Sequence, residues 1–195
     1  MTVPGIAYRL LDGVAAAERE GDLLALAAEV YGDSAARGTA PGPEAARQAR
    51  VRRRQPGFAL AEARHGGYLV GFASGLPLRP SASWWHGLTT PLPEEVTAEH
   101  PGRTFALAEL LVRASWRRQG IGRELHDLLL GGRPEERATL TVPPAASAAQ
   151  HAFRSWGWQK VARTRGGGGA SPAAPVLDVL VLSPLAGPGR RRSAR

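Results

Sequence analysis

FALAELLVRASWRRQGIGR, from Phe105 to Arg123, is the stretch of sequence that decides the fold. Its first half is an apolar run that a single carboxylate, Glu109, interrupts, and such a run is typical of a strand buried on both faces. Its second half is a basic turn with glycines at positions 120 and 122. Apolar residues at helical spacing follow from Ile121 to Leu129, so the pattern predicts a strand, a turn and a helix.

This turn is also a predicted anion site. A helix that begins directly after a strand leaves its first N–H groups without intrahelical partners, at the positive end of the helix dipole. Gly120 and Gly122 have no side chain to keep a ligand away from the backbone. The sequence therefore predicts a phosphate site at the start of the helix.

The spacing R-x-x-G-x-G, formed by Arg117, Gly120 and Gly122, resembles the acyl-CoA signature of GNAT acetyltransferases. The resemblance extends roughly over residues 58–182 and is clearest over 105–161. It implies an α/β GNAT fold: a mixed, mainly antiparallel sheet of about seven strands with about four flanking helices and splayed central strands. It further implies an enzyme that moves an acetyl group from acetyl-CoA to a primary amine, by direct transfer in a ternary complex.

The resemblance also assigns roles to individual residues. Backbone N–H groups near Leu111 and Val112 would bind the thioester oxygen and the pantetheine arm. The residues expected to bind acetyl-CoA are Leu111, Val112, Arg117, Arg118, Gln119, Gly120, Ile121, Gly122, Arg123 and Phe153.

Glu109 is the expected catalytic residue. In the family, the counterpart of this strand carboxylate commonly acts as a general base, often through a water molecule. The alternative is a structural carboxylate, since a charge inside an apolar run needs an ion pair or hydrogen bonds. Its central position in the strand that leads to the turn favours the catalytic interpretation.

Two positions depart from the family pattern. In F-R-S-W-G-W, Phe153 stands where relatives often have the tyrosine that protonates the departing thiolate. Ala146 stands where the family usually has an asparagine that bonds pantetheine. These departures leave open a degenerate GNAT module that binds acyl-CoA without turnover.

An insert over residues 79–103 separates two predicted strands, and its Trp84-Trp85-His86 cluster is a candidate acceptor site. Long connections of this kind often act as lids or binding loops. The alternative is a surface excursion whose tryptophans dock on the core. Both interpretations stay open at the level of sequence.

The N-terminal part predicts a strand, then helices that begin near Asp22, as an N-cap, and at Pro43. In GNAT proteins such helices border the acceptor site, but nothing here identifies the acceptor, whether a small molecule or a protein amine. A homodimer is left open.

Composition sets the remaining expectations. The 195 residues suit one domain, 1–186, with a basic disordered tail at 187–195. There is no cysteine, and no pattern of a metal site, a signal peptide or a membrane span is found, so the default location is the cytoplasm. The net charge of +8 comes almost entirely from arginines. These are interpreted as solvated surface charges or as attraction for CoA phosphates; a nucleic-acid binder is disfavoured because no recognition helix or stacking strand is evident.

Overall fold

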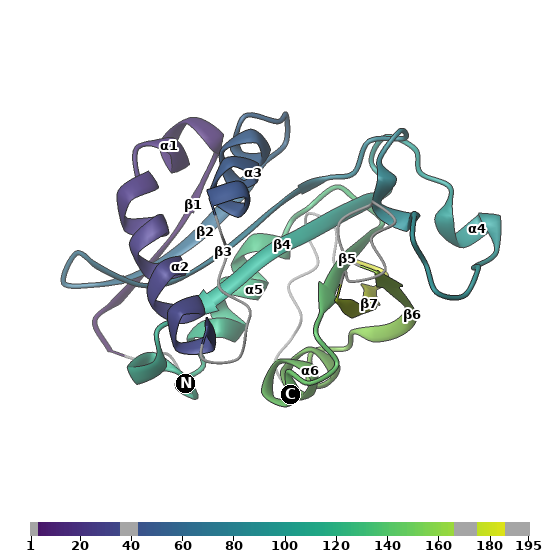
Figure 1. The fold of residues 1–195 in the computed structure, drawn as a ribbon. Helices are drawn as coiled ribbons and strands as arrows, with labels where there is room; N and C mark the ends of the chain where they lie inside the picture. The colour runs from purple at the N-terminus through teal and green to yellow at the C-terminus, as the bar shows by residue number, and fades with distance from the viewer. Residues whose placement is uncertain (1–3, 36–42, 166–174, 186–195) are drawn as a thin grey trace. The chain divides into compact units, whose positions relative to one another are not determined.

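The computed structural model describes residues 4–35, 43–165 and 175–185. A seven-stranded mixed sheet, in the order β1-β2-β3-β4-β5-β7-β6, and six α-helices make up this part of the chain (Figure 1). The chain forms two compact units, Met1–Leu76 with Leu107–Gly131 and Pro77–Ala106 with Gly132–Arg195. The central strand β4, Thr104–Val112, contributes residues to both units.

The first unit contains an antiparallel set of strands. β1, Ile6–Leu11, pairs with β2, Ala59–His65, and β2 pairs with β3, Tyr68–Pro77. β2 and β3 are joined by a turn at Gly66 and Gly67, whose φ angles are 54° and 84°. Such angles favour glycine, which explains the pair at this position.

Helices cover both faces of these strands. α1, Gly13–Ala17, α2, Glu20–Ala35, and α3, Pro43–Arg53, lie on one side, and α5, Ile121–Leu130, lies on the other (Figure 1). The side chain of Phe72 belongs to the core that α2 completes with Leu23 and Leu26. The next residue back, Gly71, faces α5, and a Cβ there would lie only 3.1 Å from Leu125. Because neighbouring strand residues point to opposite faces, β3 supports both helix layers.

The predicted N-cap at Asp22 is wrong. α2 begins at Glu20, so Asp22 lies inside its first turn, where its carboxylate accepts from Arg64 Nη2 at 2.7 Å. The N-cap is Asp12 at the start of α1, whose Oδ1 accepts from Ala15 N at 2.9 Å. The chain passes from α1 into α2 with only two residues between them, so the helical stretch already has its cap ten residues earlier.

The second unit is built around β5, Arg137–Val142, β7, Val176–Leu182, and β6, Gln159–Arg165, which pair antiparallel in that order. β5 also forms a short parallel ladder with the start of β4, from Thr104↔Arg137 to Ala106↔Thr139. Helix α6, Ser147–Ser155, precedes β6, and its C-cap residue Trp156 is followed by Gly157 with a φ of 94°.

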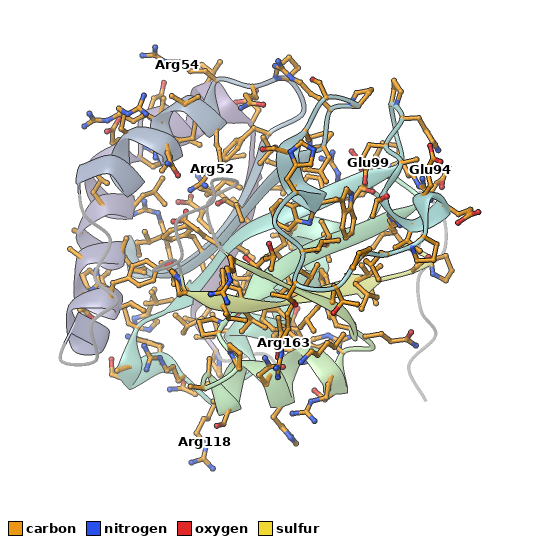
Figure 2. All side chains as sticks on the ribbon, turned by 45° about the vertical axis from the view of Figure 1, so that its right-hand side comes forward. Arg52, Arg54, Glu94, Glu99, Arg118 and Arg163 are labelled. Carbon is orange, nitrogen blue, oxygen red and sulfur yellow. The ribbon has the colours of Figure 1, made fainter. Side chains whose placement is uncertain are left out.

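The insert is docked within this second unit, as the docking interpretation expected. It contains a 3-10 turn, η1, at Ser83–Trp85 and a short helix, α4, at Glu94–Thr97. Trp85 is buried, and its Nε1 donates to Glu99 Oε1 at 2.8 Å. Thr104 Oγ1 and Arg137 Nη2 also donate to this carboxylate oxygen, at 2.9 and 3.0 Å. Glu99, labelled in Figure 2, therefore ties the insert to the strands beneath it.

Candidate functional site

The turn before α5 has the geometry predicted for an anion site. Gly120 occupies the N-cap position in the left-handed region, with φ of 84°, and no side chain caps the helix. Within the described part of the chain, the backbone N–H groups of Ile121 and Gly122 donate to no other residue. These two donors therefore remain available at the positive end of the helix dipole.

The arginines of this turn differ in what they contact. Arg117 donates from Nε to the carbonyl oxygen of Val112 at 2.9 Å, which holds the turn against the end of β4. Arg123 pairs with Asp127 one helical turn later at 2.6 Å. Arg118 is exposed, has a φ of 62° and projects away from the turn (Figure 2). Gln119 donates to Ser115 O at 3.1 Å. Arg118 is thus the cation of the turn best placed to meet an anion from solvent.

Glu109 is half-buried on the face of β4 that carries Leu111, which belongs to the core beneath α2. Ser74 Oγ lies 3.4 Å from Glu109 Oε2, a long hydrogen bond from the neighbouring part of β3. The carboxylate lines a cavity of about 240 Å³ enclosed by α2, α3 and strands β2 to β4. Glu109 therefore has an accessible oxygen in a predominantly apolar space, which suits a group that accepts a proton.

Small side chains create this cavity. Ala27 and Ala28 of α2 face Ala46 and Ala49 of α3 across it. Leucine or phenylalanine residues at such positions would fill the space between two helices and a sheet, as they do elsewhere in the core. The opening is therefore a consequence of the alanine pattern on the inner sides of the two helices.

Tyr31 of α2 contributes a phenol to the same cavity. Burial, and after it the negative charge of Glu109, raise the pKa of Tyr31 to about 12, against the opposing influence of Arg52. The phenol therefore stays protonated throughout the neutral range and can donate a hydrogen bond. Tyr31 lies within electrostatic reach of both the carboxylate and the guanidinium.

A sequence model of the acetyltransferase (GNAT) family matches residues 22–158, which include the cavity, β4 and the glycine turn. The chain belongs to this family. No curated protein sequence matches it.

Solved structures of GNAT acetyltransferases share the fold. An acetyltransferase from Thermus thermophilus is 18% identical, with 94% of this chain and 99% of that chain covered and a TM-score of 0.61. The ribosomal-protein-S18-alanine N-acetyltransferase from Escherichia coli is 12% identical over 97% and 99%, with a TM-score of 0.62. The PaiA N-acetyltransferase from Thermoplasma acidophilum, in complex with coenzyme A, is 12% identical over 91% and 98%, with a TM-score of 0.58.

The two departures from the GNAT pattern lie in the second unit. Phe153 is buried in an aromatic cluster, with ring centroids 5.4 Å from Trp156 and 5.7 Å from Trp158. Ala146 is the N-cap of α6 and makes no side-chain cap bond. The phenylalanine therefore serves as a packing residue of α6, and the start of this helix has lost the amide expected from relatives.

The Trp84-Trp85-His86 cluster does not line the cavity beside Glu109 and belongs to the other unit. Trp84 Nε1 donates to Thr139 Oγ1 at 3.1 Å, and Trp85 is buried as described above. His86 is exposed, and its backbone oxygen accepts from Thr164 Oγ1 at 3.3 Å. All three residues thus take part in holding the insert in place.

Sequence reasoning missed four polar residues of the cavity: Tyr31, Arg52, Arg53 and Ser74. The signal for Arg52 was the alternation of alanines and arginines on α3, where Ala46, Ala49 and Arg52 recur every three residues. This spacing places them along one side of a helix. The described residues contain no helix long and apolar enough to cross a membrane.

Proposed function

We propose that this GNAT protein is an N-acetyltransferase that moves an acetyl group from acetyl-CoA to a primary amine. The observation that carries the proposal is Glu109, a carboxylate in an otherwise mostly apolar cavity, on the strand that runs directly into the glycine turn. Family membership supports acetyl transfer. The coenzyme A bound in the solved structure of a relative supports acetyl-CoA as the acetyl donor.

The turn supplies the donor site. The N–H groups of Ile121 and Gly122 bind a phosphate of CoA, and Arg118 adds a positive charge from the solvent side. The N–H groups near Leu111 and Val112, at the end of β4, polarise the thioester carbonyl and stabilise the oxyanion that develops on it. Phe153 and its aromatic neighbours pack the second unit.

The cavity supplies the acceptor site. An amine enters it, gives a proton to Glu109 directly or through a water molecule, and attacks the carbonyl carbon in its neutral form. A nitrogen–carbon bond forms, the carbon–sulfur bond breaks, and the CoA thiolate leaves. A thiol has a pKa near 8.5, so the thiolate is a tolerable leaving group that water can protonate.

The deciding experiment is a screen of primary amines with saturating acetyl-CoA, following the release of free thiol and the mass of the acetylated product. Amine-dependent thiol release that is matched by acetylated product supports the proposal. If calorimetry shows that CoA binds but no amine of a broad panel is acetylated, the protein is a binding module without turnover, as the loss of the tyrosine and the asparagine would suggest.

A further inference from the structure

One arginine of the cavity wall stands apart from its neighbours. α3 carries Arg50, Arg52 and Arg53 in its last turn. Arg50 and Arg53 both pair with Glu20 of α2, the latter at 3.3 Å. These two guanidinium groups therefore share one internal carboxylate and fasten α3 to α2. Arg53 also lines the cavity, and its buried Nη2 makes no hydrogen bond among the described residues beyond this ion pair.

Arg52 has no such partner. In the described part of the chain, no carboxylate, carbonyl or hydroxyl group pairs with its side chain, although it lines the cavity and is only partly exposed. Figure 2 shows it on the side of α3 that faces the strands, whereas Arg54 points outward. A guanidinium in a mostly apolar wall, without a counter-charge, is poised to bind an anion that enters from outside.

The cavity thus presents two opposite charges to one ligand. Glu109 lies on the strand side and Arg52 on the helix side, and the phenol of Tyr31 is under the electrostatic influence of both. Alanine and leucine side chains line the space around them. A small acceptor that carried only an amine would leave the guanidinium of Arg52 without a negatively charged partner.

We propose that the acceptor is a small apolar amino acid whose amine is directed to Glu109 and whose carboxylate is bound by Arg52. This inference rests on the proposed function for its substrate site but makes a separate claim, namely that a carboxylate on the acceptor is recognised. The planar fork of the guanidinium matches a carboxylate through two parallel hydrogen bonds. The hydroxyl of Tyr31 adds a neutral donor to the lining of the cavity.

Matched acceptor pairs test the claim in turnover. Aminohexanoate is compared with hexylamine, and phenylalanine with phenethylamine, at saturating acetyl-CoA. At least one carboxylated member should have a kcat/KM about tenfold to a hundredfold above that of its partner. This factor corresponds to the free energy that hydrogen bonds to a charged group usually contribute. The two pairs also distinguish an ω-amino acid from an α-amino acid.

Variants then assign the effect to Arg52. Arg52→Gln should remove the preference within each pair, mainly by raising KM for the carboxylated member. Arg52→Lys should retain part of the preference, because it keeps the charge and loses the fork. Arg52→Glu should invert it and favour a diamine over the amino acid. Arg54→Gln is the matched control, since Arg54 is exposed and lies outside the cavity lining.

A binding experiment separates this inference from the proposed function. Calorimetry with the amino acids alone, without acetyl-CoA, measures occupation of the cavity whether or not acetyl transfer follows. Binding to the native protein that Arg52→Gln abolishes and Arg54→Gln preserves supports the inference even if no product forms. The inference is overturned if both members of each pair are acetylated with equal kcat/KM. It is also overturned if the carboxylated member is preferred but Arg52→Gln leaves that preference intact. In both cases the proposed acetyltransferase activity is still supported. Failure of every carboxylated probe to bind or react also overturns it.

Discussion

At the scale of single residues, the candidate site depends on charges placed in apolar surroundings. Glu109 keeps one weak hydrogen bond from Ser74, and Arg52 has no internal partner among the described residues. Structural charges elsewhere in the protein are treated differently. Oε1 of Glu99 accepts three hydrogen bonds, although its buried Oε2 has no partner among the described residues, and Asp178 contacts Lys160, Arg163 and Gln150. The contrast supports a functional role for the under-bonded pair.

Glu109→Gln should lower kcat by roughly tenfold to several-hundredfold, because the amide keeps the shape of the side chain but cannot accept the amine proton. CoA affinity should stay unchanged, since the anion site lies beyond the C-terminal end of β4, at the turn before α5. Steady-state kinetics and calorimetry provide the two readouts. Ser74→Ala is a useful companion, as it removes the one side-chain donor to the carboxylate. A fully active Glu109→Gln protein would make this carboxylate structural.

Phe153→Tyr should raise kcat by less than about tenfold, below the usual contribution of a general acid. The ring is buried among Trp156 and Trp158, so an added hydroxyl must find a partner there, and the thiolate leaves without help near neutral pH. A stopped-flow or steady-state comparison at the same acceptor concentration suffices. A gain of about a hundredfold would mean that the native protein lacks an acid it needs.

At the scale of elements, the turn into α5 and the insert belong to different compact units. The turn exposes backbone donors because two residues, Arg118 and Gly120, adopt positive φ angles just before the helix. The insert is anchored by Trp85 and Glu99 and lies in the second unit. A substitution in the turn should therefore leave the structure of the insert unchanged, and a substitution in the insert should leave the turn unchanged.

Gly122→Asp should reduce CoA affinity by tenfold or more, because it sets a carboxylate at the place of a phosphate. An acidic residue in the first turn of a helix is favourable for the helix itself, so the variant should stay folded. Gly122→Ala is the control for the added Cβ and should bind CoA more tightly than Gly122→Asp. Calorimetry on both proteins measures the effect, and equal affinities would move the phosphate site away from this turn.

Trp85→Ala should lower the free energy of unfolding by about 3–5 kcal/mol, the usual cost of removing a buried aromatic side chain. The substitution also removes the hydrogen bond from Trp85 Nε1 to Glu99, which keeps its ion pair with Arg137. Chemical denaturation measures the loss. The hypothesis that the insert shapes the acceptor pocket predicts in addition a selective rise in the acceptor KM, so kinetics at a temperature where the variant is folded decide between the two roles.

For the molecule as a whole, the buried carboxylate of Asp178 should contribute to acid sensitivity. Burial tends to raise the pKa of Asp178, but hydrogen bonds from Lys160 and Arg163, with help from Gln150, outweigh it and hold the pKa below the ordinary value of 3.8. A carboxyl with a lowered pKa in the folded state stabilises the protein above its unfolded pKa. That stabilisation disappears as the pH falls through the folded value.

Asp178→Asn should therefore destabilise the protein by about 1–3 kcal/mol at neutral pH, because charged hydrogen bonds between α6, β6 and β7 become neutral or are lost. The difference from the native protein should shrink as the pH drops below about 4. Denaturant titrations at several pH values follow it. A difference that stays constant down to about pH 3 would show that the charge of Asp178 contributes nothing to stability.

The sequence by itself determined the family, the strand–turn–helix from Phe105 to Leu130 and the open glycine turn within it. These features depend on local causes: an apolar run, glycines where φ is positive, and helical spacing. The same locality explains why the helix start at Pro43 was predicted correctly. Asp22 is also a good N-cap by residue type, but it does not cap a helix. Whether an aspartate caps a helix depends on where the preceding helix ends.

Only the tertiary structure decided what surrounds Glu109 and how the insert is used. The cavity arises from alanines of α2 and α3 that are far apart in sequence, and it acquires Tyr31 and Arg52 from those helices. Nothing local distinguishes Arg52 from Arg50 or Arg53; they differ because Glu20, about thirty residues earlier, pairs with two of the three. Long-range ion pairs thus distinguish Arg52 from its neighbours, because Arg50 and Arg53 share the carboxylate of Glu20 and Arg52 does not.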